Sequence, residues 1–206
     1  MNRAELKAAA KNQIQGKIGI LFLITLIIAL ISGVAGAILS AIPGGSLVVS
    51  IIITPAFSLS LIRVYLNVAK GYTPKAGDAF CGFDDFWSAF KVTFLVGLFT
   101  FLWSLLFVIP GIIKSFSYSM STYILAENKG KSALECINES KAMTDGHKMD
   151  LFVLGLSFIG WGFLCVITLG IASIWVIPYM NATYINAYNS LKPIVPEAEP
   201  ANTEAE

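Results

Sequence analysis

Two long stretches without a charged side chain constrain this chain more than any other feature of its sequence. Residues 18–42 form an uncharged run of 25 residues, and residues 151–191 form another of 41. An α-helix needs roughly 20 predominantly apolar residues to cross the hydrocarbon core of a bilayer. The first run is therefore long enough for one membrane-spanning helix. The second is too long for one helix and predicts two.

The composition of the whole chain agrees with a membrane protein. Of its 206 residues, 56% are hydrophobic and only 13% are charged, whereas soluble domains have about a quarter charged residues. So few charges could not cover the surface of a water-soluble fold of this length. The net charge of +1 provides no basic field that would attract nucleic acid. We therefore predict an all-α polytopic membrane helix bundle that has no nucleic-acid partner.

The first 17 residues predict a helix that lies on the membrane surface. Arg3, Lys7 and Lys11 alternate with apolar side chains at helical spacing, which is typical of interfacial amphipathic helices. A signal peptide is the rival interpretation, because Ala35 and Ala37 resemble a cleavage site. However, signal peptides have an apolar core of about 7–15 residues, far shorter than the uncharged run here. We therefore favour a surface helix followed by a membrane span.

Turn signals and charged segments divide the rest of the chain into further apolar stretches. We treat residues 1–191 as a single membrane domain and residues 192–206 as a disordered acidic tail, because this tail contains three prolines and four glutamates. The predicted spans are residues 18–42, 46–69, 91–109, 111–127, 150–168 and 171–191.

The polar segments between the apolar stretches predict two more amphipathic surface helices. Aromatic side chains recur every three or four residues from Phe80 to Phe90, which is typical of anchors at a membrane interface. Ser132 and Glu135 form a capping box at the start of a helix that continues to about Met143. The resulting architecture is three hairpins joined by amphipathic interfacial helices.

The segment 111–127 decides between four spans and six. Cytoplasmic loops collect lysine and arginine. With six spans, 13 of the 14 basic residues lie at or near the cytoplasmic face, and Lys114 is the exception. With four spans, Lys129 and Lys131 would lie opposite the basic N-terminus. We therefore predict six spans with both termini cytoplasmic.

An internal repeat supports the hairpin arrangement. Gly97 and Trp103 match Gly155 and Trp161 at an offset of 58 residues. A second set of matches, at an offset of 61, pairs Tyr118, Thr122, Tyr123, Ile124 and Ala126 with Tyr179, Thr183, Tyr184, Ile185 and Ala187. Residues 80–127 and 138–188 therefore look like two copies of one unit, which consists of a surface helix and a helical hairpin.

Several separate motifs resemble one known family. They are Gly82-Phe83, Trp103, the run Ile109-Pro110-Gly111-Ile112-Ile113-Lys114, Tyr118-Ser119-Met120, Glu139-Ser140-Lys141, Gly146-His147-Lys148, Leu156 to Trp161, Trp175 and Pro178-Tyr179. In this order they resemble the bacterial integral membrane family called domain of unknown function 975, over nearly all of residues 1–192. That family also resembles, distantly, the membrane domain of some glycerophosphodiester phosphodiesterases. The resemblance implies a bacterial plasma-membrane protein without an assigned activity.

The candidate functional residues are polar side chains within the predicted spans. Such residues face protein or water rather than lipid. Interhelical hydrogen bonding explains them adequately, and a polar cavity is the alternative. For Lys114 and Arg63, reaching the headgroups is the simpler interpretation, and binding an anionic lipid or solute is the other. The candidates are Arg63, Lys114, Tyr118, Thr122, Tyr179, Thr183 and Asn186.

No motif for catalysis is recognisable. His147 is the sole histidine, and the three cysteines have no metal-binding spacing. We therefore predict no enzyme activity, cofactor or metal site. We expect a non-enzymatic membrane component that binds lipid or a partner protein, or that forms a homo-oligomer. The alternative is a permease or channel for small solutes or lipids, with a path along the polar faces of the fourth and sixth spans.

Overall fold

The computed structural model describes residues 2–41, 52–106 and 108–192. Every regular element within these ranges is helical, which confirms the predicted all-α fold class. Residues 43–45, which connect the first two predicted spans, and residues 193–206 of the tail predicted at 192–206 lie outside the described residues. In chain order the α-helices and the two 3₁₀ helices are α1 (Arg3–Ile14), α2 (Ile18–Leu39), α4 (Thr54–Ala69), η2 (Ala76–Phe80), η3 (Phe83–Asp85), α5 (Phe86–Leu106), α6 (Val108–Tyr118), α7 (Ser121–Glu127), α8 (Ala133–Thr144), α9 (Lys148–Leu156), α10 (Ile159–Ile167) and α11 (Ser173–Leu191).

The helices α1 and α8 begin and end in the same way. Asn2 caps α1 by accepting a hydrogen bond from the first turn, and Ser132 caps α8 in the predicted capping box with Glu135. Each helix has 12 residues and is followed by a glycine with positive φ, 72° at Gly16 and 78° at Gly146. Glycine adopts this backbone conformation without a steric penalty. The chain therefore turns at once into α2 or α9.

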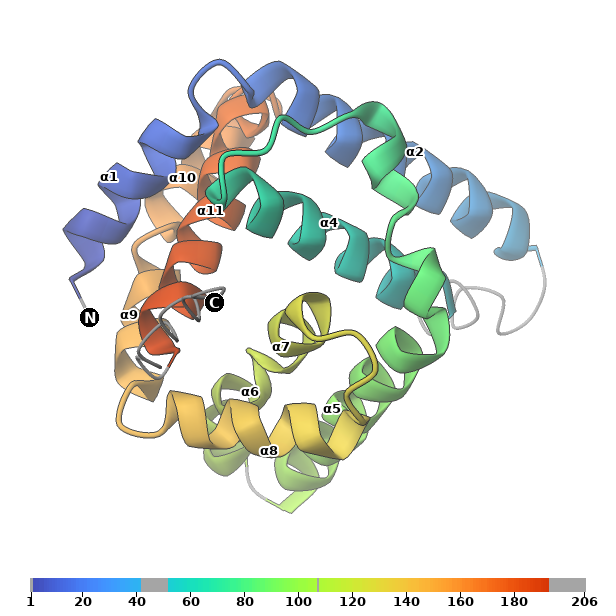
Figure 1. Cartoon of the computed structure of the whole chain (residues 1–206), viewed down its shortest axis with the longest axis vertical. Coiled ribbons are helices and arrows are strands. Elements are labelled where there is room, and N and C mark those ends of the chain that lie inside the picture. Colours follow the sequence, from blue (N-terminus) through green and yellow to red (C-terminus); the bar gives the residue numbers. More distant parts are fainter. Residues whose placement is uncertain (1, 42–51, 107, 193–206) are drawn as a thin grey trace, which may run out of the picture.

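The helices α4, α7 and α11 occupy the centre of the molecule (Figure 1). Helix α4 contacts both of the others, and the rings of Tyr123 on α7 and Tyr188 on α11 lie 5.6 Å apart. The surface helices pack against this centre from outside: α1 against α11, η2 against α4, and α8 against α7. Most of the side chains of α4 and most of the second half of α11 are buried as a result.

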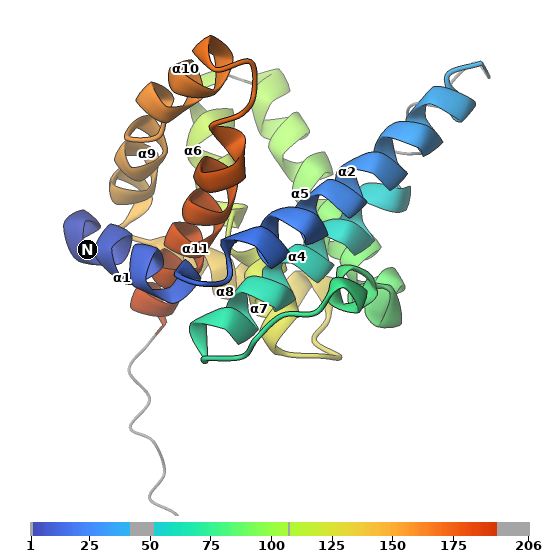
Figure 2. The same ribbon diagram turned by 90° about the horizontal axis from the view of Figure 1, so that it is seen from above.

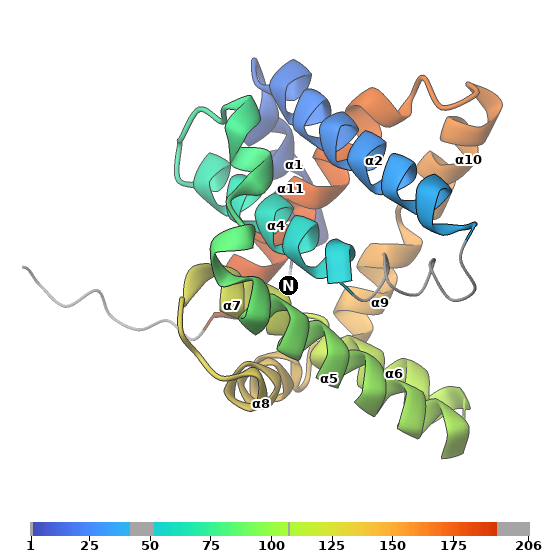
Figure 3. The same cartoon turned by 90° about the vertical axis from the view of Figure 1, so that its right-hand side faces the viewer.

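The helices α2, α5, α9 and α10 surround the centre and expose large apolar side chains. Leu30, Phe101 and Phe163 are 58%, 63% and 66% exposed. Figure 2 shows α1 and α8 at one side of the molecule, whereas α2, the α5–α6 pair and the α10–α11 pair extend towards the other side. Figure 3 shows α5 and α6 running side by side to a common tip.

Three helical segments are long and apolar enough to cross a membrane, judged by length and composition. They are Ile18–Leu39, Ala76–Leu106 and Lys148–Ile167. The described residues thus provide three such helices rather than the predicted six, and the arrangement as three hairpins stays a prediction.

The other three predicted spans are too short, interrupted or too polar to count among these helices. Helix α4 has 16 described residues, and the segment 111–127 is divided between α6 and α7. Helix α11 has 19 residues, but tyrosine, asparagine and threonine lower its hydropathy. Helices α4, α7 and α11 belong to the buried centre, whereas α6 exposes Ile109, Ile112 and Ile113.

Candidate functional site

Arg63 is an interior side chain rather than a residue that reaches the membrane surface. It is 7% exposed, and its guanidinium donates hydrogen bonds to the backbone oxygens of Cys81 (2.8 Å) and Ala126 (3.4 Å). The same group forms an ion pair with Asp85. Arg63 therefore connects α4 to the segment around η2 and η3 and to α7. The partners that the structure gives Arg63 are protein groups, which agrees with the interpretation as an interior polar side chain.

Tyr118 and Thr122 do not share one helix, although both lie within the predicted span 111–127. Helix α6 ends at Tyr118, and α7 begins after Met120. The hydroxyl of Ser140 on α8 donates to the oxygen of Ser117 (2.8 Å) and accepts from the nitrogen of Met120 (3.2 Å). A side chain of the surface helix thus satisfies backbone groups that the break leaves without helical partners.

Tyr118 and Thr122, the polar candidates of the fourth predicted span, are both largely enclosed by protein. Tyr118 is 4% exposed, with the ring of Phe99 at 6.2 Å and the amino group of Lys141 5.5 Å from its ring centroid. Thr122 is half-buried. These contacts agree with packing between helices.

The polar candidates of the sixth predicted span are Tyr179, Thr183 and Asn186 on α11, and two of them donate to backbone oxygens. Thr183 is fully buried and donates to the oxygen of Tyr179 (2.7 Å) on the same helix. Asn186 is 7% exposed and donates to the oxygen of Leu6 (3.2 Å), which fixes α1 on α11. A cavity of about 350 Å³ lies beside this helix, but its polar lining includes Asn181 rather than the predicted residues.

Lys114 contacts an aromatic ring. Its amino group lies 4.8 Å from the ring centroid of Trp103 on α5, and the lysine is half-buried. This distance is within the range of a cation–π interaction. Lys114 therefore links the two arms of the α5–α6 hairpin, a contact that the sequence did not predict.

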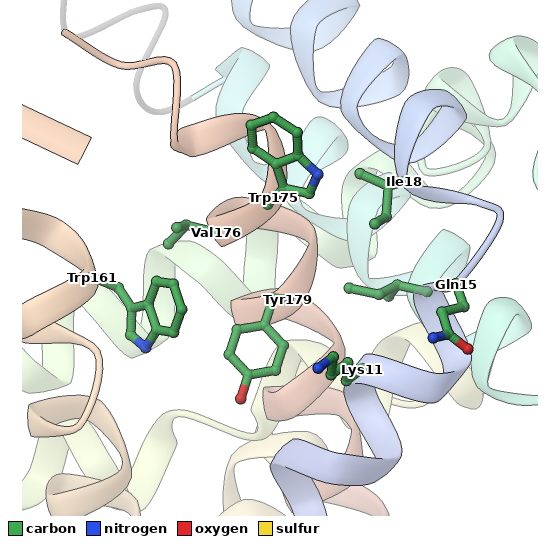
Figure 4. Close-up of a pocket in the computed structure, with 8 residues that line it drawn as sticks. Lys11, Gln15, Ile18, Trp161, Trp175, Val176 and Tyr179 are labelled. Atoms are coloured by element: carbon green, nitrogen blue, oxygen red, sulfur yellow. The ribbon is translucent and has the colours of Figure 1, made fainter. Parts of the chain in front are cut away.

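A groove between α1, the start of α2 and the α10–α11 hairpin was not predicted (Figure 4). It has a volume of about 430 Å³, and it is lined by Lys11, Ile14, Gln15, Ile18, Trp161, Trp175, Val176 and Tyr179. A second cavity of about 350 Å³ shares Trp161, Trp175 and Val176 and continues towards the turn after α10. The two tryptophans lie on opposite arms of the predicted hairpin, at similar distances from its turn. This spacing was the signal in the sequence that could have indicated an aromatic groove.

The C-terminal ends of the three central helices meet in a cluster of charges. Glu127 accepts hydrogen bonds from Tyr188 (2.9 Å) and Lys192 (2.7 Å), and Lys70 lies 3.7 Å from the same carboxylate. One carboxylate at the end of α7 thus joins the ends of α4 and α11. Its two lysines and one tyrosine are consistent with a structural role.

Titratable side chains elsewhere do not gather into a metal site. Among residues 2–41, 52–106 and 108–192, no group of three or more histidine, cysteine, aspartate or glutamate side chains is positioned to hold a metal ion. His147 lies 3.2 Å from Asp150, three residues further along the chain. This pair lies at the junction of α8 and α9, whereas the polar candidates lie on α6, α7 and α11.

Comparison of the chain with known proteins gives one informative result. Neither the curated proteins nor the solved structures provide a match. Residues 1–114 and 105–194, nearly the entire chain, match one protein family in two overlapping segments. The chain therefore belongs to the family described as "Protein of unknown function (DUF975)".

Proposed function

We propose that this protein is a non-enzymatic component of the bacterial plasma membrane that crosses the bilayer as three helical hairpins and binds membrane lipid. The observation that carries this proposal is that the chain returns several times to one region, where the ends of α1, α4, α7 and α11 meet. The amino group of Lys17 donates to the oxygen of Tyr72 (3.0 Å). Lys70 and Lys192 both pair with Glu127, at 3.7 and 2.6 Å.

These contacts join the chain before and after each proposed hairpin. Between Lys17 and Lys70, between Lys70 and Glu127, and between Glu127 and Lys192, the chain leaves this place and comes back. If α2, α5 and α9–α10 cross the bilayer, the segment that follows each of them must cross it again to return to this region. The junctions are rich in lysine, which favours the cytoplasmic side. Six crossings with both termini inside follow.

The different polarity of the helices supports the same topology. The three segments that are apolar enough to span are the outer helices, which expose their side chains. The proposed return helices α4, α6–α7 and α11 include the buried, more polar centre. A helix enclosed by protein can carry polar groups that a lipid-facing helix cannot. Low hydropathy in these segments is therefore compatible with crossing.

We also extend the internal repeat from two units to three. Asn67, Asn128 and Asn189 follow one another at intervals of 61 residues, at the C-terminal ends of α4, α7 and α11. In each unit a surface segment precedes an outer helix and then a central helix. Each surface segment packs on the central helix of the preceding unit, and α1 packs on that of the last. This closed order supports three units of one design.

The polar side chains favour a binding component over a permease, the alternative function. Thr183 bonds to its own helix, Asn186 to α1, and Tyr118 packs against protein. Arg63 with Asp85 and Glu127 with its lysines are engaged in ion pairs that hold helices together. These side chains act as helix contacts, whereas transport would require a continuous polar path.

Cysteine labelling in intact cells tests the topology. In a variant that lacks the native cysteines, Lys131→Cys should react with an impermeant thiol reagent only after the cells are permeabilised. Leu169→Cys, at the 93% exposed turn after α10, should react from outside. Cys136 is buried, and its burial raises the pKa of the thiol, so it should react slowly. It is nevertheless replaced, so that all labelling comes from the introduced cysteine. Labelling of Lys131→Cys from outside would overturn the six-span arrangement.

Lipid analysis tests the binding function. We expect the protein, purified from bacterial membranes in a mild detergent, to retain phospholipid that a further wash does not remove. Mass spectrometry of the intact complex identifies the retained lipid and also any partner protein or second copy. Complete loss of lipid under conditions that preserve the helical fold would contradict lipid binding.

A further inference from the structure

We infer that the groove between α1, α2 and the α10–α11 hairpin binds one anionic phospholipid, with an acyl chain against the two tryptophans and the phosphate at Lys11. This inference rests on the proposed lipid-binding function and assigns it a site. Figure 4 shows Lys11 and Gln15 at one end of the groove and the rings of Trp161 and Trp175 along its walls.

The walls of the groove suit a hydrocarbon chain. Trp161 and Trp175 are 42% and 55% exposed, and Val176 lies at the base between them. The adjoining cavity continues the apolar surface along α11 as far as Ala172. From Tyr179 to Ala172 the helix rises about 10 Å, at 1.5 Å per residue. This length is comparable with one leaflet of the hydrocarbon core, about 15 Å.

The open end of the groove carries positive charge. Arg3, Lys7 and Lys11 follow one another at intervals of four residues, so they share one face of α1. Lys7 lies 4.6 Å from the ring centroid of Phe158. Among the described residues Lys11 forms no ion pair, and Glu5, the single acid of α1, is hydrogen-bonded to Asn2. An anionic headgroup therefore complements this end of the groove.

The aromatic wall is held in position before any ligand binds. The rings of Trp161 and Tyr179 meet edge to face at 6.0 Å, and Phe158 lies 5.7 Å from Tyr179. Val176 is 8% exposed and Ile14 is 4% exposed, so the base of the groove is a packed contact between α1 and α11. A rigid wall lowers the entropic cost of holding an acyl chain.

Quenching by brominated lipids tests the site. The chain has four tryptophans, Trp87, Trp103, Trp161 and Trp175. In the double variant Trp87→Phe/Trp103→Phe, only the groove tryptophans emit. In phosphatidylcholine vesicles with a small fraction of brominated phosphatidylglycerol, we expect about fivefold tighter apparent association than for brominated phosphatidylcholine, since one lysine near the surface contributes about that factor.

Two matched controls isolate the site. The reverse variant, Trp161→Phe/Trp175→Phe, should show equal quenching by the two brominated lipids. Lys11→Gln should abolish the preference at the groove, whereas Lys114→Gln, which removes the other lysine near a tryptophan, should retain it. Lys11 is exposed and Lys114 is half-buried, and circular dichroism checks that each variant remains folded.

The outcomes separate this inference from the lipid-binding function itself. If the preference for phosphatidylglycerol appears at Trp87 and Trp103 instead, or persists in Lys11→Gln, the site assignment is wrong while lipid binding stands. If neither pair of tryptophans distinguishes the lipids and the purified protein retains none, both proposals fall.

Discussion

At the scale of single residues, the centre of the molecule is organised by side chains that bind backbone oxygens. Arg63 and Asn186 each connect helices from different parts of the chain in this way. A backbone oxygen offers a hydrogen-bond acceptor at any residue type. The sequence therefore identifies such a donor as buried or polar, but it does not reveal its partner.

The ion pair of Arg63 gives a prediction at this scale. Asp85→Asn removes the charge that faces the guanidinium and leaves a buried cation without its carboxylate. We expect a loss of roughly 1–3 kcal/mol in stability, visible as a lower melting temperature in detergent. Asp84→Asn, at the exposed neighbouring position, is the control and should melt like the unmodified protein. Equal melting temperatures for both variants would show that the pair contributes little.

At the scale of elements, the α5–α6 hairpin depends on one close approach. A Cβ placed on Gly111 would overlap the backbone and side chain of Ser104 on the facing helix. We expect Gly111→Ala to separate the two arms and to destabilise the fold by roughly 1–3 kcal/mol, as overpacking usually does. Thermal unfolding in detergent measures this loss.

A second glycine of the same hairpin provides the control. Gly97 lies in α5 with open space where a Cβ would project. Gly97→Ala should therefore be neutral or slightly stabilising, because alanine has the higher helix propensity. If Gly111→Ala were as well tolerated as Gly97→Ala, the close packing of the two arms would not be important for stability.

Some of the helices could be predicted from the sequence, and others could not. Apolar runs predicted α2 and the α9–α10 segment, and the capping box at Ser132 predicted the start of α8. The break between α6 and α7 was missed. The residues at the break have no strong turn signal, and the stabilising contact comes from Ser140, 20 residues further along the chain. Tertiary contacts of this kind are not visible in local patterns.

At the scale of the whole molecule, α1 packs on α11 and is joined to it by a hydrogen bond. Asn186→Ala removes the hydrogen bond to Leu6, which is worth about 1 kcal/mol. We expect amide hydrogen exchange in α1 to increase about fivefold while the centre of α4 is unaffected. Asn189→Ala, at an exposed position of the same helix, should leave exchange in α1 unchanged. An unchanged α1 in Asn186→Ala would show that apolar packing alone fixes this helix.

The candidate groove became recognisable only at this scale. Lys11 and Trp175 stand 164 residues apart in the chain, and each had a simpler interpretation when considered alone. The sequence predicted the surface helix that carries Lys11 and the hairpin that carries Trp175. It did not predict their contact, because a linear pattern does not specify which surface helix packs on which hairpin.

The docking of α1 on α11 sets an order for events during biosynthesis. The hydrogen bond between Leu6 and Asn186 spans 180 residues, and ribosomes add about 5–20 residues per second. For roughly 10–35 s, therefore, the emerging N-terminal helix has no final partner, and its basic face is free to rest on anionic headgroups. The docking of α1 therefore waits until Asn186 has been synthesised, and until then Lys11, which lines the groove, is free of α11.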